Sequence, residues 1–253
     1  MSINASRSPE YVARALLAFL EIWPPVDLST IVRKIGLSVV NVPSDFEGAL
    51  VRIENRPKGV IGLRTGMSKR RRRFTIAHEI GHYVLPGHGI SRAFCSKKRI
   101  GLLGKSTNEF ESAANQFAGE FLLPRKAVSA MIGELGVSID TCELVSECFQ
   151  TSLTAAAVRC VELSDVWVAL VESRNGVVRQ VKRGDRFKDY VPINKKFGSE
   201  ALANELSENQ LHKQGMVPAW AWIRIESTSL KIMEDSFLIP KYNRVLTLLS
   251  EMT

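Results

Sequence analysis

Apolar residues recur at helical spacing in two opening segments of the chain. The first begins after Ser8-Pro9, and the second is capped by Asp27 or Ser29 and ended by Gly36. Three short runs of β-forming residues follow, separated by Gly, Pro and Asn, as expected for a small sheet. These runs cover residues 37–42, 49–53 and 60–64.

Helical periodicity then returns in two longer segments. The pattern predicts one helix over 71–84, stopping before Pro86-Gly87, and another over 109–123, ending at Pro124. Between them, residues 87–108 are weakly patterned and predict a long loop, and loops of that length in a compact domain are often functional. Three further helical segments follow, the last over 153–163.

The pattern changes to period two after Asp165. Runs at 167–172 and 177–182 are joined through Asn175-Gly176, a strong hairpin signal. Residues 219–225 alternate again, and 236–249 contain further strand-like pieces. We therefore expect an α+β fold with three domains. These are a helical core with a small β-sheet over 1–124, a helical extension over 125–164, and a smaller β-rich module over 165–253.

Composition and cysteine usage narrow the class of protein. Of 253 residues, 45% are hydrophobic and 24% are charged, an ordinary globular balance. No segment resembles a signal peptide or a membrane-spanning helix. The four cysteines form no C-x-x-C pair, and we expect buried, reduced thiols. These features predict a cytoplasmic protein that does not act at a membrane.

The net charge of +8 allows an acidic protein partner or a nucleic acid. Much of this charge is local. An unbroken basic run covers 69–73, and Lys97, Lys98, Arg99 and Lys105 lie in the following loop. A solvated surface explains the run equally well, so the sequence leaves both interpretations open.

The segment with the most chemistry is His78-Glu79-Ile80-Gly81-His82. On a helix, His78 and His82 lie one turn apart on the same face, so both imidazoles can reach one metal ion. Glu79 is offset by one residue and is therefore expected to act as the catalytic general base on a water molecule. The pattern predicts a Zn2+ site.

A zinc site needs a third protein ligand, and the helix over 109–123 offers Glu111. Asn115 lies one turn later on the same face, where it is expected to hydrogen-bond a ligating histidine and fix its tautomer. Glu109 is explained by its place at the helix start, and Glu120 lies on another face. His88 is the remaining alternative ligand.

These motifs resemble the ImmA/IrrE family of metallo-endopeptidases. The resemblance rests on Arg73-Phe-Thr-Ile-Ala-His-Glu-Ile-Gly-His82 and on Glu111-Ser-Ala-Ala-Asn-Gln-Phe-Ala-Gly-Glu-Phe-Leu-Leu-Pro124. It covers roughly residues 37–163, and the segment 149–159 is similar to the helix-turn-helix-like element that often follows the peptidase core. By resemblance, the fold is zincin-like and Glu111 is the third zinc ligand.

The resemblance implies peptide hydrolysis, with a helix-turn-helix transcriptional repressor as the protein substrate. It also implies that the module over 165–253 is a reduced sensor-like domain. The alternative is a DNA-binding or antitoxin-like regulator with a non-catalytic metal site, for which nucleic acid would be a partner. Closed structural zinc sites usually have four ligands rich in cysteine, and no cysteine of this chain is placed to contribute.

Overall fold

The computed structural model describes residues 8–52, 58–86, 92–95, 108–225, 227 and 229–251, with only the backbone described over 92–95. The described residues form seven α-helices and two sheets, which confirms the expected α+β fold. The chain divides into two compact units, residues 1–127 with 146–155 and residues 128–145 with 156–253. The three functional domains expected from the sequence stay a prediction.

Most helices and strands lie where the sequence pattern predicts them, and β4 lies in a segment that was expected to be a loop. The helices are α1 Pro9–Phe19, α2 Leu28–Lys34, α3 Lys69–Val84, α4 Glu109–Leu122, α5 Arg125–Leu135, α6 Ile139–Cys148 and α7 Leu153–Leu163. The strands are β1 Leu37–Val42, β2 Gly48–Arg52, β3 Gly59–Arg64, β4 Arg92–Cys95, β5 Val168–Arg174, β6 Val177–Arg183, β7 His212–Pro218, β8 Lys231–Ile239 and β9 Arg244–Ser250.

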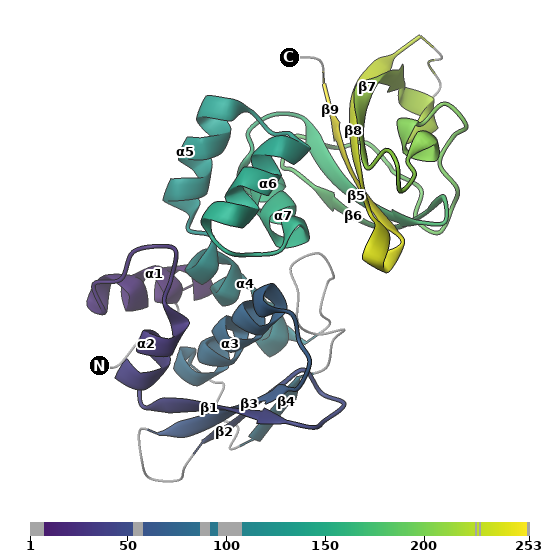
Figure 1. Cartoon of the computed structure of the whole chain (residues 1–253). Coiled ribbons are helices and arrows are strands. Elements are labelled where there is room, and N and C mark those ends of the chain that lie inside the picture. The colour runs from purple at the N-terminus through teal and green to yellow at the C-terminus, as the bar shows by residue number, and fades with distance from the viewer. Residues whose placement is uncertain are drawn as a thin grey trace. The chain divides into compact units, whose positions relative to one another are not determined.

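In the first unit, helices α1 to α4 lie on one face of a four-stranded sheet (Figure 1). The strand order is β1-β3-β2-β4, with β1 parallel to β3 and the other pairs antiparallel. The core between sheet and helices includes Leu50, Ile61, Ile80 and Phe117, all almost fully buried. This packing fixes α3 and α4 against the sheet and against each other.

Both of these helices begin at a capping side chain. Ser68 Oγ accepts a hydrogen bond from the backbone N–H of Arg71, and Asn108 Oδ1 accepts one from Phe110. Such caps satisfy backbone donors that the first helical turn leaves unpaired. The start of each helix is therefore encoded locally.

The second unit is built on an antiparallel sheet of order β6-β5-β9-β8-β7. Asn175 and Gly176 have φ angles of 51° and 70°, the geometry of a tight hairpin turn, so the predicted β5–β6 hairpin is confirmed. Residues 168–171 are all buried, so both faces of β5 are covered. Phe187 and Val191, which follow β6, and Trp222, which follows β7, pack in one core cluster with Ala169 and Val171 of β5.

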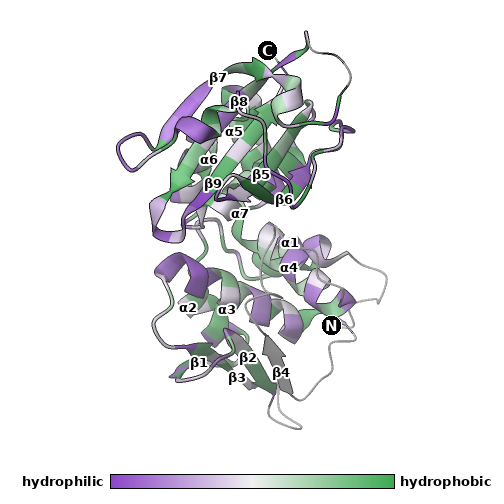
Figure 2. Cartoon of the chain, turned by 90° about the vertical axis from the view of Figure 1, so that its right-hand side faces the viewer, coloured by the Kyte–Doolittle hydropathy of each residue, from purple (hydrophilic) through white to green (hydrophobic). Residues whose placement is uncertain are grey.

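The strand predicted at 219–225 is wrong. Residues Ala219–Ala221 form a 3-10 turn, and the buried Trp222 donates from its indole Nε1 to Glu234 at 2.6 Å. That long-range bond ties the segment to β8 and overrides its alternating pattern. Strand β7, which the pattern missed, is largely hydrophilic in Figure 2 and lies at the edge of the sheet, where it pairs with β8.

The basic run at the start of α3 makes structural contacts. Arg71 pairs with the buried Glu47, while Arg72 donates to the Asn41 side chain and Arg73 to the backbone oxygen of Val26. These bonds join α3 to β1, to the start of β2 and to the segment before α2. Less of this basic run is therefore available as an exposed surface for an acidic partner. The other basic residues, Lys97, Lys98, Arg99 and Lys105, lie outside the described residues.

Helix α7 corresponds to the segment expected to resemble a helix-turn-helix element. Residues 155–161 are all buried, including Arg159, which agrees with a core helix. Of the cysteines, Cys142 and Cys160 are buried as expected, whereas Cys148 at the end of α6 is exposed. No helix among the described residues has an apolar stretch long enough to cross a membrane.

Replacing Glu47 with Ala is expected to destabilise the protein. Glu47 is 2% exposed and accepts from Arg71 Nε at 2.6 Å, so its loss leaves a partly buried guanidinium without its carboxylate. We expect the free energy of unfolding to fall by about 2–3 kcal/mol, measured by urea denaturation. Asp45→Ala, at an exposed carboxylate two residues earlier, should change it by less than about 0.5 kcal/mol. Equal stabilities of the two variants would contradict this structural role.

Candidate metal centre

Helix α3 carries three polar side chains into the core. His78 and Glu79 are fully buried, and His82 is 5% exposed. The histidines are four residues apart, so their side chains lie one above the other on the face that meets α4. Their Nε2 atoms are 3.1 Å apart. The structure therefore brings the two predicted imidazole ligands together.

Helix α4 supplies the other two residues of the predicted site. Glu111 and Asn115 are also one turn apart and are nearly buried. Glu111 Oε2 lies 3.3 Å from His78 Nε2, and Glu111 Oε1 lies 3.7 Å from His82 Nε2. The ligand atoms of His78, His82 and Glu111 all lie within 4.8 Å of one another.

This donor set fits a zinc ion. Zinc binds histidine nitrogen and carboxylate oxygen at about 2.0–2.2 Å with tetrahedral angles, which places donor atoms roughly 3.3 Å apart. The observed separations of 3.1, 3.3 and 3.7 Å lie around that value. Two imidazoles and one carboxylate also form a set that leaves a fourth position for water or substrate.

Asn115 orients one of the imidazoles. Its Oδ1 lies 2.9 Å from His78 Nδ1 and accepts the proton on that nitrogen, so Nε2 carries the lone pair that faces Glu111. Burial also lowers the pKa of His78, which keeps the ring neutral near pH 7. Both effects produce the form of histidine that binds a metal.

The carboxylate of Glu111 is held in its ionised form. Burial by itself raises the pKa of Glu111, but the interactions with His78 and His82 outweigh burial and hold the pKa below its ordinary value. Glu111 therefore presents a negative charge to the two imidazoles. A carboxylate in this state is the form that coordinates a cation.

The competing ligands considered from sequence lie elsewhere. Glu109 is exposed in the first turn of α4. Glu120 is buried, and its Oε1 pairs with Arg14 of α1 at 3.2 Å and accepts the backbone N–H of Arg125 at 3.3 Å. Glu120 thus serves packing between helices. His88 lies outside the described residues.

Two glycines allow the backbone to approach the site closely. A Cβ atom at Gly48, the first residue of β2, would lie 2.4 Å from Glu79 Oε1. A Cβ atom at Gly81 would lie 3.1 Å from Phe117 Cδ1 and 3.3 Å from Ala114 Cα. Gly48 thus leaves room for the Glu79 carboxylate, and Gly81 lets α3 and α4 pack closely enough for their side chains to meet.

Arg52 holds the end of the helix that carries His82. Its Nη2 donates to the backbone oxygens of His82 and Tyr83, both at 2.8 Å, and its guanidinium lies 4.9 Å from the centre of the Tyr83 ring. Carbonyls in the last helical turn have no partners within the helix, so a cation there is favourable. Sequence reasoning missed Arg52 and Gly48 because each lies some thirty residues from its partner.

Comparison with known protein families agrees with this geometry. The model of the IrrE N-terminal-like domain, a family of M78 peptidases, matches residues 34–161. The chain belongs to this family. Membership confirms the resemblance drawn from the two motifs, and it indicates a metal-dependent peptidase. The IrrE-like match covers all four residues of the candidate centre and Glu79.

A solved structure shares the fold of this IrrE-like chain. It is a Mycobacterium tuberculosis transcriptional regulator, with a TM-score of 0.57 and 14% sequence identity. The alignment covers 96% of this chain and 75% of the regulator. At 14% identity, the similarity shows a shared fold and does not show a shared function. Comparison of the sequence with curated proteins found no match.

Replacing Gly48 with Ala is expected to disturb Glu79 in this IrrE-like domain. The new methyl group would collide with the buried carboxylate at 2.4 Å, so either Glu79 or β2 must move. We expect the free energy of unfolding to fall by about 1–3 kcal/mol, measured by urea denaturation. Gly62→Ala in β3 is the control, because its Cβ would meet Val42 at an ordinary 3.5 Å. If both variants were equally stable, Gly48 would not be what gives Glu79 its space.

Proposed function

We propose that this chain is a zinc-dependent endopeptidase in which His78, His82 and Glu111 bind the metal and Glu79 is the general base. The observation that carries the proposal is the convergence of two imidazole nitrogens and one carboxylate, on adjacent helices, at separations that suit zinc. Asn115 is proposed to fix the tautomer of His78. Family membership supports the peptidase class.

In the proposed hydrolysis, the bound zinc ion and Glu79 have separate roles. A zinc ion bound at this centre supplies positive charge that acidifies water and polarises a peptide carbonyl. Glu79 takes a proton from the attacking water at its carboxylate and hands it to the leaving amine nitrogen. The site is buried, which strengthens these electrostatic interactions because little water is present to screen them.

The proposed substrate is a helix-turn-helix transcriptional repressor, whose cleavage would release its target genes. The resemblance of the two motifs to ImmA/IrrE endopeptidases supports this choice. The net charge of +8 would favour approach to an acidic surface, including a repressor bound to DNA.

A DNA-binding or antitoxin-like regulator with a non-catalytic metal site is the weaker candidate. Arg71, Arg72 and Arg73 contact Glu47, Asn41 and Val26, so less of the basic run faces solvent than its sequence suggests. Nucleic acid remains a secondary partner in this view. Salt-dependent binding of a DNA duplex by the purified protein would favour this candidate over the peptidase.

Replacing Glu111 with Ala should abolish stoichiometric zinc. Glu111 is the only carboxylate among the described residues that lies with both histidines, so its loss leaves two ligands. We expect about one zinc per wild-type chain by elemental analysis, and at least a tenfold loss of zinc affinity in the variant. Glu109→Ala, at an exposed carboxylate two residues earlier, should bind zinc as the wild type does. Full zinc in Glu111→Ala would contradict the proposed ligand set.

Replacing Glu79 with Gln should leave zinc binding intact and stop cleavage. The amide keeps the size of the side chain but cannot take a proton from water, so we expect the rate to fall by about 10²–10⁴. Cells producing the wild type or the variant can be compared by mass spectrometry of protein N-termini. A new N-terminus within a helix-turn-helix repressor should appear only with the wild type.

Two other outcomes of that comparison have distinct meanings. The same new N-terminus at wild-type abundance with Glu79→Gln would contradict the role of Glu79. New N-termini confined to other protein classes would contradict the repressor as substrate while leaving the peptidase mechanism standing. Glu109→Gln serves as the matched control and should behave as the wild type.

A further inference from the structure

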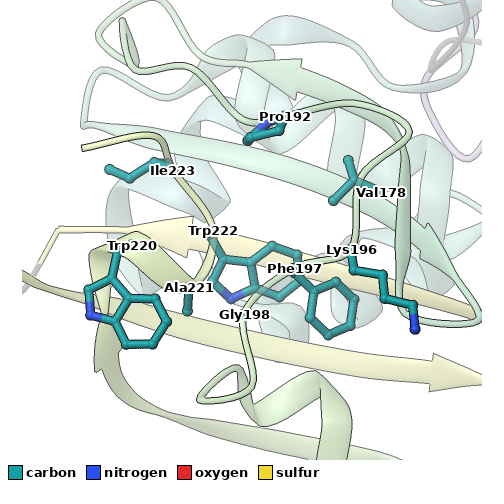
Figure 3. A pocket seen from close by; sticks show the side chains of 9 residues that line it. All are labelled: Val178, Pro192, Lys196, Phe197, Gly198, Trp220, Ala221, Trp222 and Ile223. Atoms are coloured by element: carbon teal, nitrogen blue, oxygen red, sulfur yellow. The ribbon is translucent and has the colours of Figure 1, made fainter. Parts of the chain in front are cut away.

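The second unit contains a cavity of about 200 Å³ that the peptidase chemistry does not use. Its walls come from the segment before the 3-10 helix η1, Leu202–Glu205, and from the 3-10 turn that follows β7, with Val178 of β6 (Figure 3). The lining residues are Val178, Pro192, Lys196, Phe197, Gly198, Trp220, Ala221, Trp222 and Ile223. All belong to one compact unit, so the cavity does not depend on the first unit.

The floor of the cavity is held by a buried carboxylate. Glu234 of β8 is fully buried and accepts from Trp222 Nε1 at 2.6 Å. The same carboxylate accepts the backbone N–H groups of Leu202 and Ala203 at 3.0 and 2.7 Å, and the Ser236 hydroxyl at 2.8 Å. Four donors to one carboxylate fix Trp222 and the chain around η1 in place.

Close backbone packing fixes the opposite side. The N–H of Gly198 donates to the carbonyl of Ala221 at 2.7 Å, and a Cβ atom at Gly198 would lie 2.8 Å from Ala221 Cα. The Phe197 and Trp222 rings stack with centroids 4.5 Å apart. The cavity is therefore preformed, which reduces the entropic cost of binding a ligand.

The side chains that line the cavity are apolar or aromatic, except for that of Lys196. Figure 3 shows Trp220 at one end of the row and Phe197 with Lys196 at the other, with Trp222 between them. Trp220 is 39% exposed, so part of its indole ring faces solvent. Within the described part of the chain, the ammonium group of Lys196 has no carboxylate at ion-pair distance.

We propose that this cavity binds a small carboxylic acid with a single apolar ring. The ring would lie along the aromatic row that runs from Trp220 through Trp222 to Phe197, and the carboxylate would pair with Lys196 at the Phe197 end. The volume of the cavity limits the ligand to a molecule with one ring, because sites for drug-sized molecules usually enclose about 300–1,000 Å³. The site would give the second unit a ligand of its own, independent of the metal centre.

Phenylacetate is a suitable probe, and tryptophan signals report its position. In full-length, zinc-loaded protein labelled with ¹⁵N at tryptophan, the indole signals can be assigned with single Trp→Phe variants. Phenylacetate should shift the signals of Trp220 and Trp222 saturably. Those of Trp23 and Trp167 should stay unchanged, since Trp167 donates to Asp189 and packs on Phe187 away from the cavity.

A matched pair of lysines tests the role of the charge. Lys196→Met should weaken phenylacetate binding by about fivefold or more, whereas Lys195→Met, at the neighbouring exposed lysine outside the lining, should change it by less than about twofold. Phenylacetamide, the neutral analogue, should bind the wild type more weakly than phenylacetate does. Its affinity should be the same for the wild type and for Lys196→Met. Both lysines are exposed, and unchanged melting temperatures would show that both variants fold.

Several results would overturn the proposal. They are no saturable shift of Trp220 and Trp222 at millimolar phenylacetate, equal shifts at all four tryptophans, and equal binding by the two lysine variants. Glu79→Gln should bind phenylacetate as the wild type does. A failure of the peptidase proposal would therefore leave this result unaffected, and the two proposals fail separately.

Discussion

The close contact between α3 and α4 at Gly81 is the constraint on which the candidate centre depends. A Cβ atom at this residue would lie 3.3 Å from Ala114 Cα, so no larger side chain fits without moving one of the helices. Only at this helix separation do His78 and His82 lie 3.3 and 3.7 Å from Glu111. Helix caps, the sheet and the bonds from Arg52 then fix how far each helix has turned about its axis. The chemistry therefore rests on a packing contact between small residues.

The buried carboxylates Glu111 and Glu234 are compensated in different ways. Burying a carboxylate costs several kcal/mol unless charges or hydrogen bonds compensate. In the second unit, Glu234 receives four hydrogen-bond donors, so it has a structural role and the nearby cavity takes its charge from Lys196 instead. In the first unit, Glu111 meets two imidazoles whose nitrogens surround one point. A divalent cation bound by these three side chains would offset the cost of burial, and in the proposed mechanism it would also supply the catalytic charge.

Much of the first unit could be predicted because its signals are local. The helices of the centre carry their own caps and period, and the i, i+4 spacing of His78 with His82 and of Glu111 with Asn115 is a property of a single helix. Residues that act across long sequence separations were missed, such as Gly48 beside Glu79 and Arg71 beside Glu47. In the second unit, the segment of Trp222 is not a strand although its pattern alternates, and the indole of Trp222 bonds to Glu234. Strand β7 was missed because Val217 is its one buried residue, which gives no apolar period. Local patterns do not contain such tertiary contacts.

The most direct test is a crystal structure of the zinc-loaded protein with diffraction data collected on both sides of the zinc absorption edge. The expected result is one anomalous peak about 2.0–2.2 Å from His78 Nε2, His82 Nε2 and a carboxylate oxygen of Glu111, with Asn115 Oδ1 still bonded to His78 Nδ1. A zinc peak bound by other residues, or none at this position in protein that contains stoichiometric zinc, would contradict the proposed centre and the peptidase mechanism built on it.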